Sequence, residues 1–296
     1  MLDRIETLGE MNAQRHQIDV AELAESAQSL KPLPQTTSQI IAVLGDPLFE
    51  ISDLIKVIAL DPTLTARLLR VANSASYTTA RPAACVGDAI VRLGTGTIMA
   101  MALSVSAKPD PDVDLSPIGL TTEEFWRHCV ASVAAAEELN SRRLARFGPG
   151  FSAAALLHDI GKLILVQHMT PERVEQMAEF RANHPGHRVI DAERAVLGVD
   201  HAEAGAVVAS NWKLPEDIVG AIRNHHSPSQ WENHLWNGVV LANQIALENT
   251  GHTEYTFGDS EIVADAMLAL AVEDATYQAV ASASRDRFDN LIELFA

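Results

Sequence analysis

Hydrophobic residues recur along most of the chain at the three- and four-residue spacing of helices, whereas the alternating pattern of strands is hard to find. In the first hundred residues, Leu64, Leu68 and Val71 show this spacing on one face of a predicted helix. Turn sequences such as Gly45-Asp46-Pro47 and Asp61-Pro62 separate the apolar segments. The pattern therefore predicts an all-α protein whose first hundred residues form a compact helical layer.

Two breaks divide the helical pattern. Gly94 closes one predicted helix before the next begins near Ile98, and the segment from Lys108 to Gly119 holds three prolines and three aspartates, which forbid a regular helix. Further helices are predicted over residues 125–143, 152–168, 171–183, 191–196, 201–212, 215–225, 239–247, 259–270 and 273–295. We therefore expect an N-terminal extension (1–28), an N-terminal helical subdomain (29–108), a linker loop (109–120), a helical core (121–250) and a C-terminal helical tail (251–296).

Composition and charge narrow the class of partner. Lys and Arg number 22 against 39 Asp and Glu, so the formal net charge is −17, and no run of Lys and Arg occurs. Phosphate backbones and anionic lipid surfaces repel such a chain, so we expect neither nucleic acid nor a membrane as a partner. The two cysteines, Cys85 and Cys129, form no CxxC pair, which indicates a reducing compartment. No signal-peptide pattern and no stretch of about 18 apolar residues is visible, so the protein is expected in the cytoplasm.

The chain is rich in histidine, and five of the eleven histidines fall beside apolar positions on or at the ends of predicted helices. These five are His128, His158, His201, His225 and His226. Adjacent residues of a helix point about 100° apart, so His158 and the neighbouring Asp159 would share a metal ion only from a flanking position. Other helices must then complete the shell, and His201, His225 and His226 can supply ligands. Imidazole and carboxylate groups suit Fe, Mn, Co, Ni or Zn better than Mg or Ca.

The candidate ligands also have structural interpretations. His158 and Asp159 could be an internal hydrogen-bonded pair that holds two helices together. Glu124 and His128 lie four residues apart on one helix face and could address one ion, but an acid near a helix N-terminus also favours the macrodipole.

Two further residues can be interpreted in two ways. Lys162 lies four residues after His158 on the same face, where its head group could reach the site or extend into solvent. The spacing of Ile218, Ile222 and His225 turns His225 toward the core, so His226 would then face solvent beside it.

The string LLHDIGKLIL, with His128 upstream and His201 and His225-His226 downstream, resembles the HD superfamily of metal-dependent phosphohydrolases, especially its HD-GYP and HDOD branches. The N-terminal half decides between the branches, because LPQTTSQIIAVLGDP, IALDPTLTARLLRVANSASY, AIVRLGTGTIMAMALS and FWRHCVAS are similar to the HDOD pattern in order and spacing. The resemblance covers roughly Leu30 to Glu248. It implies an all-α, HD-type bundle in which the first helices form an HDOD subdomain beside the HD-like core.

The chain also departs from the HD pattern. The HD core ends with an Asp ligand, and the matching position here is Asn243, whose amide brings no negative charge. The Gly-Tyr-Pro signature of cyclic-di-GMP phosphodiesterases is missing, since His225-His226 is followed by Ser227-Pro228-Ser229. Glu124 lies where some multinuclear HD-GYP sites carry a Glu ligand, and Lys162 matches a lysine that contacts substrate phosphate in that branch.

The resemblance therefore implies a site for one or two divalent transition metal ions. Its ligands would come from His128, His158, Asp159, His201, His225, His226, Asn243 and Glu124, with Lys162 as the candidate catalytic residue. The preferred hypothesis is a bacterial signal-transduction regulator that acts through a protein partner. A second hypothesis is a metal or nucleotide sensor without turnover, and a third is a phosphohydrolase acting on a phosphomonoester or a cyclic nucleotide phosphodiester. A phosphate or nucleotide ligand, and a homodimer formed through either end of the chain, are compatible with these hypotheses.

Overall fold

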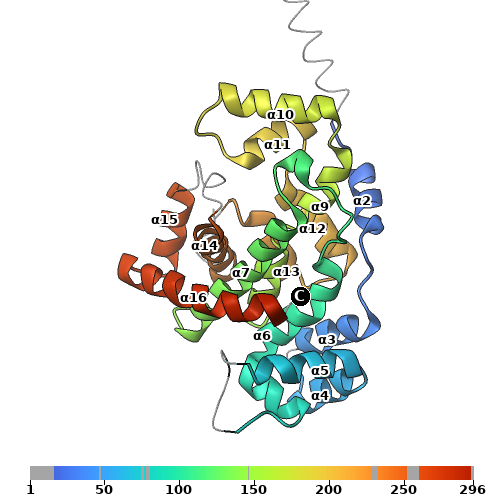
Figure 1. The fold of residues 1–296 in the computed structure, drawn as a ribbon, viewed down its shortest axis with the longest axis vertical. Helices are drawn as coiled ribbons and strands as arrows, with labels where there is room; N and C mark the ends of the chain where they lie inside the picture. The colour runs from blue at the N-terminus through green and yellow to red at the C-terminus, as the bar shows by residue number, and fades with distance from the viewer. Residues whose placement is uncertain are drawn as a thin grey trace, which may run out of the picture.

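Helices form all the regular secondary structure in the part of the chain that the structure describes, as the hydrophobic pattern predicted. The structure is a computed structural model that describes residues 17–46, 48–74, 77, 81–145, 147–227, 233–251 and 260–294. At one end of the long axis lie α3 (Gln35–Gly45), α4 (Ile51–Ala59) and α5 (Pro62–Ala72), and at the other end lie α10 (Pro171–Asn183) and α11 (Val189–Leu197) (Figure 1).

The core helices lie between these two ends. They are α6 (Val86–Ala107), α7 (Thr122–Ser141), α8 (Phe151–Leu157), α12 (His201–Asn211), α13 (Glu216–Asn224) and α14 (His234–Thr250). Helix α7 is central, because α8, α14 and the C-terminal helix α16 (Asp274–Leu294) all pack against it, while α15 (Ser260–Ala269) packs on α14. Fully buried alanines such as Ala131, Ala134 and Ala135 permit this close approach. One continuous hydrophobic core runs from Ile18 to Leu291, and the division into subdomains stays a prediction.

Helix α6 contains the break that the sequence predicted. Gly94 has φ 78° and ψ 160°, so two helical runs meet at a non-helical residue. Among the described residues, α6 is the one helix long and apolar enough to cross a membrane, a property that the sequence analysis missed because Gly, Ser and Thr dilute its apolar positions. Because 67% of its apolar window is buried inside the protein, α6 has the character of a core helix.

The N-terminal segment contains a helix that the sequence analysis did not predict. Helix α2 (Val20–Ser29) begins with a capping box in which Asp19 and Glu22 accept each other's backbone N–H groups. Its buried residues include Leu23 and Ala27, and the helix packs against α12. The segment before residue 29 is therefore partly built into the core instead of being only an extension.

The prediction of a single helix over residues 152–168 is wrong. Helix α8 ends at Leu157, a turn follows, and the chain continues as the short helices α9 (Lys162–Leu165) and η4 (Val166–His168). The cause is a close approach to α12 at Gly161, where a Cβ atom would stand 2.0 Å from the carbonyl oxygen of His201 and 2.4 Å from the backbone nitrogen of Gly205. The linker loop likewise contains a short helix, η3 (Ser116–Ile118).

Candidate metal centre

The turn after α8 places His158 and Asp159 in one buried centre. Both side chains are almost fully buried, and His158 Nε2 lies 3.5 Å from Asp159 Oδ2. The expectation that these neighbours would diverge assumed a continuous helix, and the turn removes that constraint. His128, from α7, completes a first histidine group with Nε2 3.1 Å from His158 Nε2 and 3.5 Å from Asp159 Oδ2.

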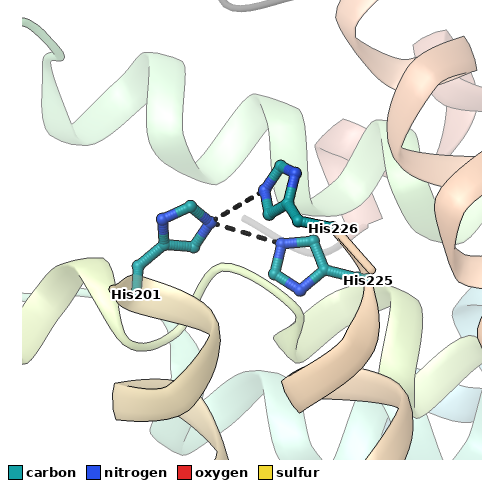
Figure 2. Close-up of side chains that lie close together, drawn as sticks. All are labelled: His201, His225 and His226. Carbon is teal, nitrogen blue, oxygen red and sulfur yellow. Dashed lines mark hydrogen bonds between the residues drawn. The ribbon is translucent and has the colours of Figure 1, made fainter. Parts of the chain in front are cut away.

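A second histidine group comprises His201, His225 and His226 (Figure 2). The Nε2 atom of His201 lies 3.3 Å from that of His225 and 3.1 Å from that of His226. The expectation that His226 faces solvent is therefore wrong. Helix α13 ends at Asn224, so both histidines follow the helix and can converge. The backbone carbonyl of His226 accepts a hydrogen bond of 2.8 Å from Arg188, which fixes this turn against the segment before α11.

Asp159 lies between the two groups. Its Oδ1 is 3.2 Å from His201 Nε2 and 3.8 Å from His225 Nε2, while Oδ2 faces the first histidine group. Lys162 Nζ lies 2.7 Å from Oδ2, so the lysine head group is in the centre and not in solvent. Burial opposes ionisation of Asp159, but Lys162, His158 and His201 outweigh it and hold the pKa of the carboxyl well below its ordinary value.

The hydrogen bonds of the histidine rings make their inward nitrogens acceptors. His158 and His225 donate through Nδ1 to the carbonyl oxygens of Ala155 and Ile222, at 2.9 and 2.6 Å. A carbonyl oxygen cannot donate, so in the neutral rings the Nε2 lone pairs point into the centre. Burial is the largest cause that lowers the pKa of His158, and also that of His225, so both rings favour this neutral form.

Lone pairs that converge at such distances repel unless a cation lies among them. A proton can play this part in the protein alone, since His201 lies between carboxylates. Burial lowers its pKa, but Glu193 and Asp159 outweigh burial and raise it to about 9. Within each histidine group, the ligand atoms all lie within 4.8 Å of one another. This arrangement is compatible with metal binding.

Glu193 is a buried member of the centre that the sequence analysis missed. Its Oε2 accepts hydrogen bonds from His201 Nδ1 at 2.7 Å and from the His201 backbone nitrogen at 2.9 Å. Such a carboxylate fixes the orientation of a ligand histidine. A sequence signal existed, because Glu193 occupies the apolar face of α11 together with the buried Ile190 and Leu197, where an acid is out of place.

Glu124 and Asn243 lie beside the centre. The Glu124 carboxylate accepts hydrogen bonds from the backbone nitrogen and the hydroxyl of Thr121, at 2.8 and 2.7 Å. Glu124 therefore also caps the N-terminus of α7, in line with its structural interpretation as an acid at a helix start. Asn243, from α14, is buried. Both line a cavity of about 30 Å³ together with His128, Asp159, Lys162 and His226. A cavity of this size has room for one or two water molecules.

A comparison with known domain families matches residues 30–228 of the chain to the HDOD domain. The chain belongs to the HDOD family. An uncharacterized protein of Treponema pallidum (strain Nichols) is 25% identical over 241 residues, which are 79% of this chain and 45% of that protein. The chain thus spans less than half the length of that relative.

Solved structures share the HDOD fold. A protein of Marinobacter aquaeolei VT8, provisionally named a signal transduction protein, is 22% identical with a TM-score of 0.68, over 93% of this chain and 64% of that one. A protein of Shewanella amazonensis SB2B, provisionally named a phosphohydrolase, is 22% identical with a TM-score of 0.63, over 92% and 98% of the two chains. An HDOD domain protein of unknown function from Geobacter sulfurreducens is 22% identical with a TM-score of 0.57, over 91% and 99%.

Proposed function

We propose that this HDOD protein is a cytoplasmic bacterial regulator of signal transduction, acting through contact with a protein partner, whose HD centre holds one or two divalent metal ions without turning over a substrate. Family membership and the signalling name of the Marinobacter structure support the regulatory part. The metal part is supported by the two histidine groups and the carboxylate of Asp159 between them.

The residues would divide between two ions. His128, His158 and Asp159 would hold one, and His201, His225 and His226 the other, with Asp159 facing both. Glu124 and Asn243 are further candidate ligands at the cavity. Bound Fe, Mn, Co, Ni or Zn would supply Lewis acidity to whatever entered the cavity.

The ion pair between Lys162 and Asp159 is the observation that supports a metal centre without catalytic turnover. With Lys162 as the counter-ion of Asp159, this carboxylate and the five histidines bring no net negative charge to the ions, Asn243 adds none, and Glu124 at the cavity is the remaining charged candidate ligand. A buried cation is expensive without compensating charge, so we expect moderate metal affinity and weak activation of bound water. The cavity of about 30 Å³ is also far smaller than a phosphoester substrate.

The alternative is a metal-dependent phosphohydrolase acting on a phosphomonoester or a cyclic nucleotide phosphodiester. The retention of five inward histidines and Asp159 favours it. In this alternative Lys162 would leave Asp159 and bind a phosphate oxygen, and the cavity would open.

Metal analysis of protein purified without chelator, after supplementation with Fe, Mn and Zn, tests the proposal. We expect bound metal, and less than about 0.1 ion per chain would contradict both the metal-bound regulator and the hydrolase. Phosphate release from model esters and cyclic dinucleotides then separates the two. Zero turnover with intact metal supports the regulator, whereas turnover that disappears in Lys162→Ala supports the hydrolase.

A further inference from the structure

A second polar site lies where the break in α6 faces α7 and α8. It is a cleft of about 870 Å³, within the size range of small-molecule sites. Its lining includes Gly94 to Thr97 of α6, Glu137 of α7 and Ser152 of α8. None of the proposed metal ligands lines this cleft. Binding at this cleft does not require a metal ion.

The α6 break supplies backbone donors to the cleft. The second helical run begins just after Gly94, and the first amides of a helical run have no carbonyl partner within that run. Gly94 has no side-chain oxygen that could cap them. The positive end of the second run's dipole therefore lies at the wall formed by residues 94–97, next to the C-terminal end of the first run.

Ser152 adds a hydroxyl to the cleft lining. The residue is only 6% exposed, and within the described part of the chain its side chain has no hydrogen-bond partner. Its Oγ lies 3.3 Å from the point where a Cβ atom on Gly96 would stand, so it faces the start of the second helical run. The hydroxyl is therefore available to donate a hydrogen bond to a ligand atom in the cleft.

The charge of the lining favours an anion. Arg92, Arg143 and Arg287 line the cleft, against the single carboxylate of Glu137 among the described lining residues. That carboxylate is already satisfied by Thr97 Oγ1 at 2.7 Å, by Arg287 at 3.1 Å and by the hydroxyl of Tyr77. Arg143 is exposed and forms no ion pair with any described residue. The cleft is thus locally cationic on a chain of net charge −17.

We propose that this cleft binds the phosphate group of a small phosphorylated molecule, with the amides of the α6 break, the Ser152 hydroxyl and the Arg143 guanidinium as donors. Phe49 and Tyr77 also line the cleft and offer rings to an organic part of the ligand. Helix α7 also carries His128, and α8 leads into His158. A ligand in the cleft therefore touches the same two helices as the metal centre. The cleft is therefore a place where a soluble signal enters this regulator.

Isothermal titration of the full-length, chelator-treated protein with inorganic phosphate and, separately, with AMP tests the proposal at constant ionic strength. Because charge-assisted hydrogen bonds are the strong ones, Arg143→Gln should weaken binding about tenfold. Ser152→Ala should weaken it about three- to fivefold through the loss of one neutral hydrogen bond. Arg181→Gln is the matched control, because Arg181 is an exposed arginine on α10 outside the cleft, and binding should not change.

The arms also identify the source of the phosphate group. Tighter binding of AMP than of phosphate indicates an organic phosphate that uses the aromatic lining, and equal binding indicates phosphate alone, and both outcomes support the site. Lys162→Gln with unchanged helical circular dichroism should leave binding unchanged, and loss of binding in this folded variant would overturn the proposal by placing phosphate in the metal centre. If neither phosphate nor AMP binds at concentrations up to about 10 mM, the binding free energy is weaker than about −3 kcal/mol, and the proposal would also be overturned. Unchanged affinity in Arg143→Gln would overturn the proposal as well. Because Arg143 is exposed, this variant should fold even if Ser152→Ala does not.

Discussion

The metal centre and the α6 cleft are built on the same two helices but present opposite chemistry. Helix α7 carries His128 in its first half and Glu137 nine residues later, a separation of about 13 Å along a helix. Helix α8 begins beside the cleft, which Phe151 and Ser152 line, and leads into the metal centre at His158. In the metal centre acceptor atoms converge, whereas in the cleft donors converge. The first arrangement calls for a cation and the second for an anion.

The difference has its origin in the backbone. At the turn after α8, the Nδ1 atom of His158 is used by a backbone carbonyl, so the inward Nε2 is an acceptor. At the break in α6, Gly94 interrupts the helix and leaves backbone N–H groups without partners in their own run. In both places an interruption of a helix makes the site, and its local hydrogen bonding decides which sign of charge it attracts.

The largest predicted effect is that of Gly161→Ala, which would disrupt the turn that builds the metal centre. The added methyl group would collide with backbone atoms of α12 at 2.0 and 2.4 Å, which cannot move aside as a flexible side chain does. We expect a loss of about 3 kcal/mol or more of unfolding free energy, measured by urea denaturation. Gly45→Ala is the control, since among the described residues no atom outside the glycine's own helix and its chain neighbours lies within 4 Å of its Cβ position. Equal stability of both variants would show that the turn is not tightly packed.

Asp159→Asn should separate the two sites. The substitution keeps the shape but removes the carboxylate that faces both histidine groups, so we expect metal affinity to fall about 100-fold or more. Phosphate binding in the cleft should stay the same, because Asp159 does not line it. Metal content by elemental analysis and phosphate titration on one preparation check both statements. Retained metal would contradict the central role of Asp159.

Much of the fold could be predicted because local signals set it. Helical spacing and the Gly and Pro residues between segments predict the helices, and Gly94 marks the break in α6. The turn at His158 could not be predicted, because its cause is the contact of Gly161 with α12, a residue pair distant in sequence. Helix α2 could have been predicted, since Asp19 and Glu22 form a readable capping box.

The site was less predictable than the fold. The histidines were found from their types and places, but the inward direction of His226 depends on where α13 ends, and a shift of one residue reverses it. The ion pair of Lys162 with Asp159 also depends on the turn. The sequence favoured a solvent-facing side chain for both Lys162 and His226, because side-chain direction follows from a backbone that the sequence pattern did not predict.

Glu193→Gln is a smaller perturbation of the metal side. A glutamine keeps the size and can still accept from His201 Nδ1, but it removes the charge that orients and polarises the ring. We expect metal affinity to fall about tenfold, at the lower end of the range for partners of a ligand histidine, with little change in helical circular dichroism. Glu203→Gln on the exposed face of α12 is the matched control. An equal effect of both variants would mean that Glu193 acts only through overall charge.

Asn243→Asp should change metal affinity by a similar amount in the opposite direction, and it tests whether the charge of the lining decides the ligand. Asn243 lines the cavity beside Asp159, where Lys162 already neutralises the carboxylate. A second carboxylate there restores negative charge, so a bound cation should be held about tenfold more tightly, a gain of about 1.4 kcal/mol. Competition with a chelator of known affinity measures this gain. In protein free of metal, the same carboxylate should lower stability, because it would be buried without a counter-ion. Unchanged metal retention would place Asn243 outside the set of ligands and leave the neutral Asp159–Lys162 pair as the element that limits metal affinity.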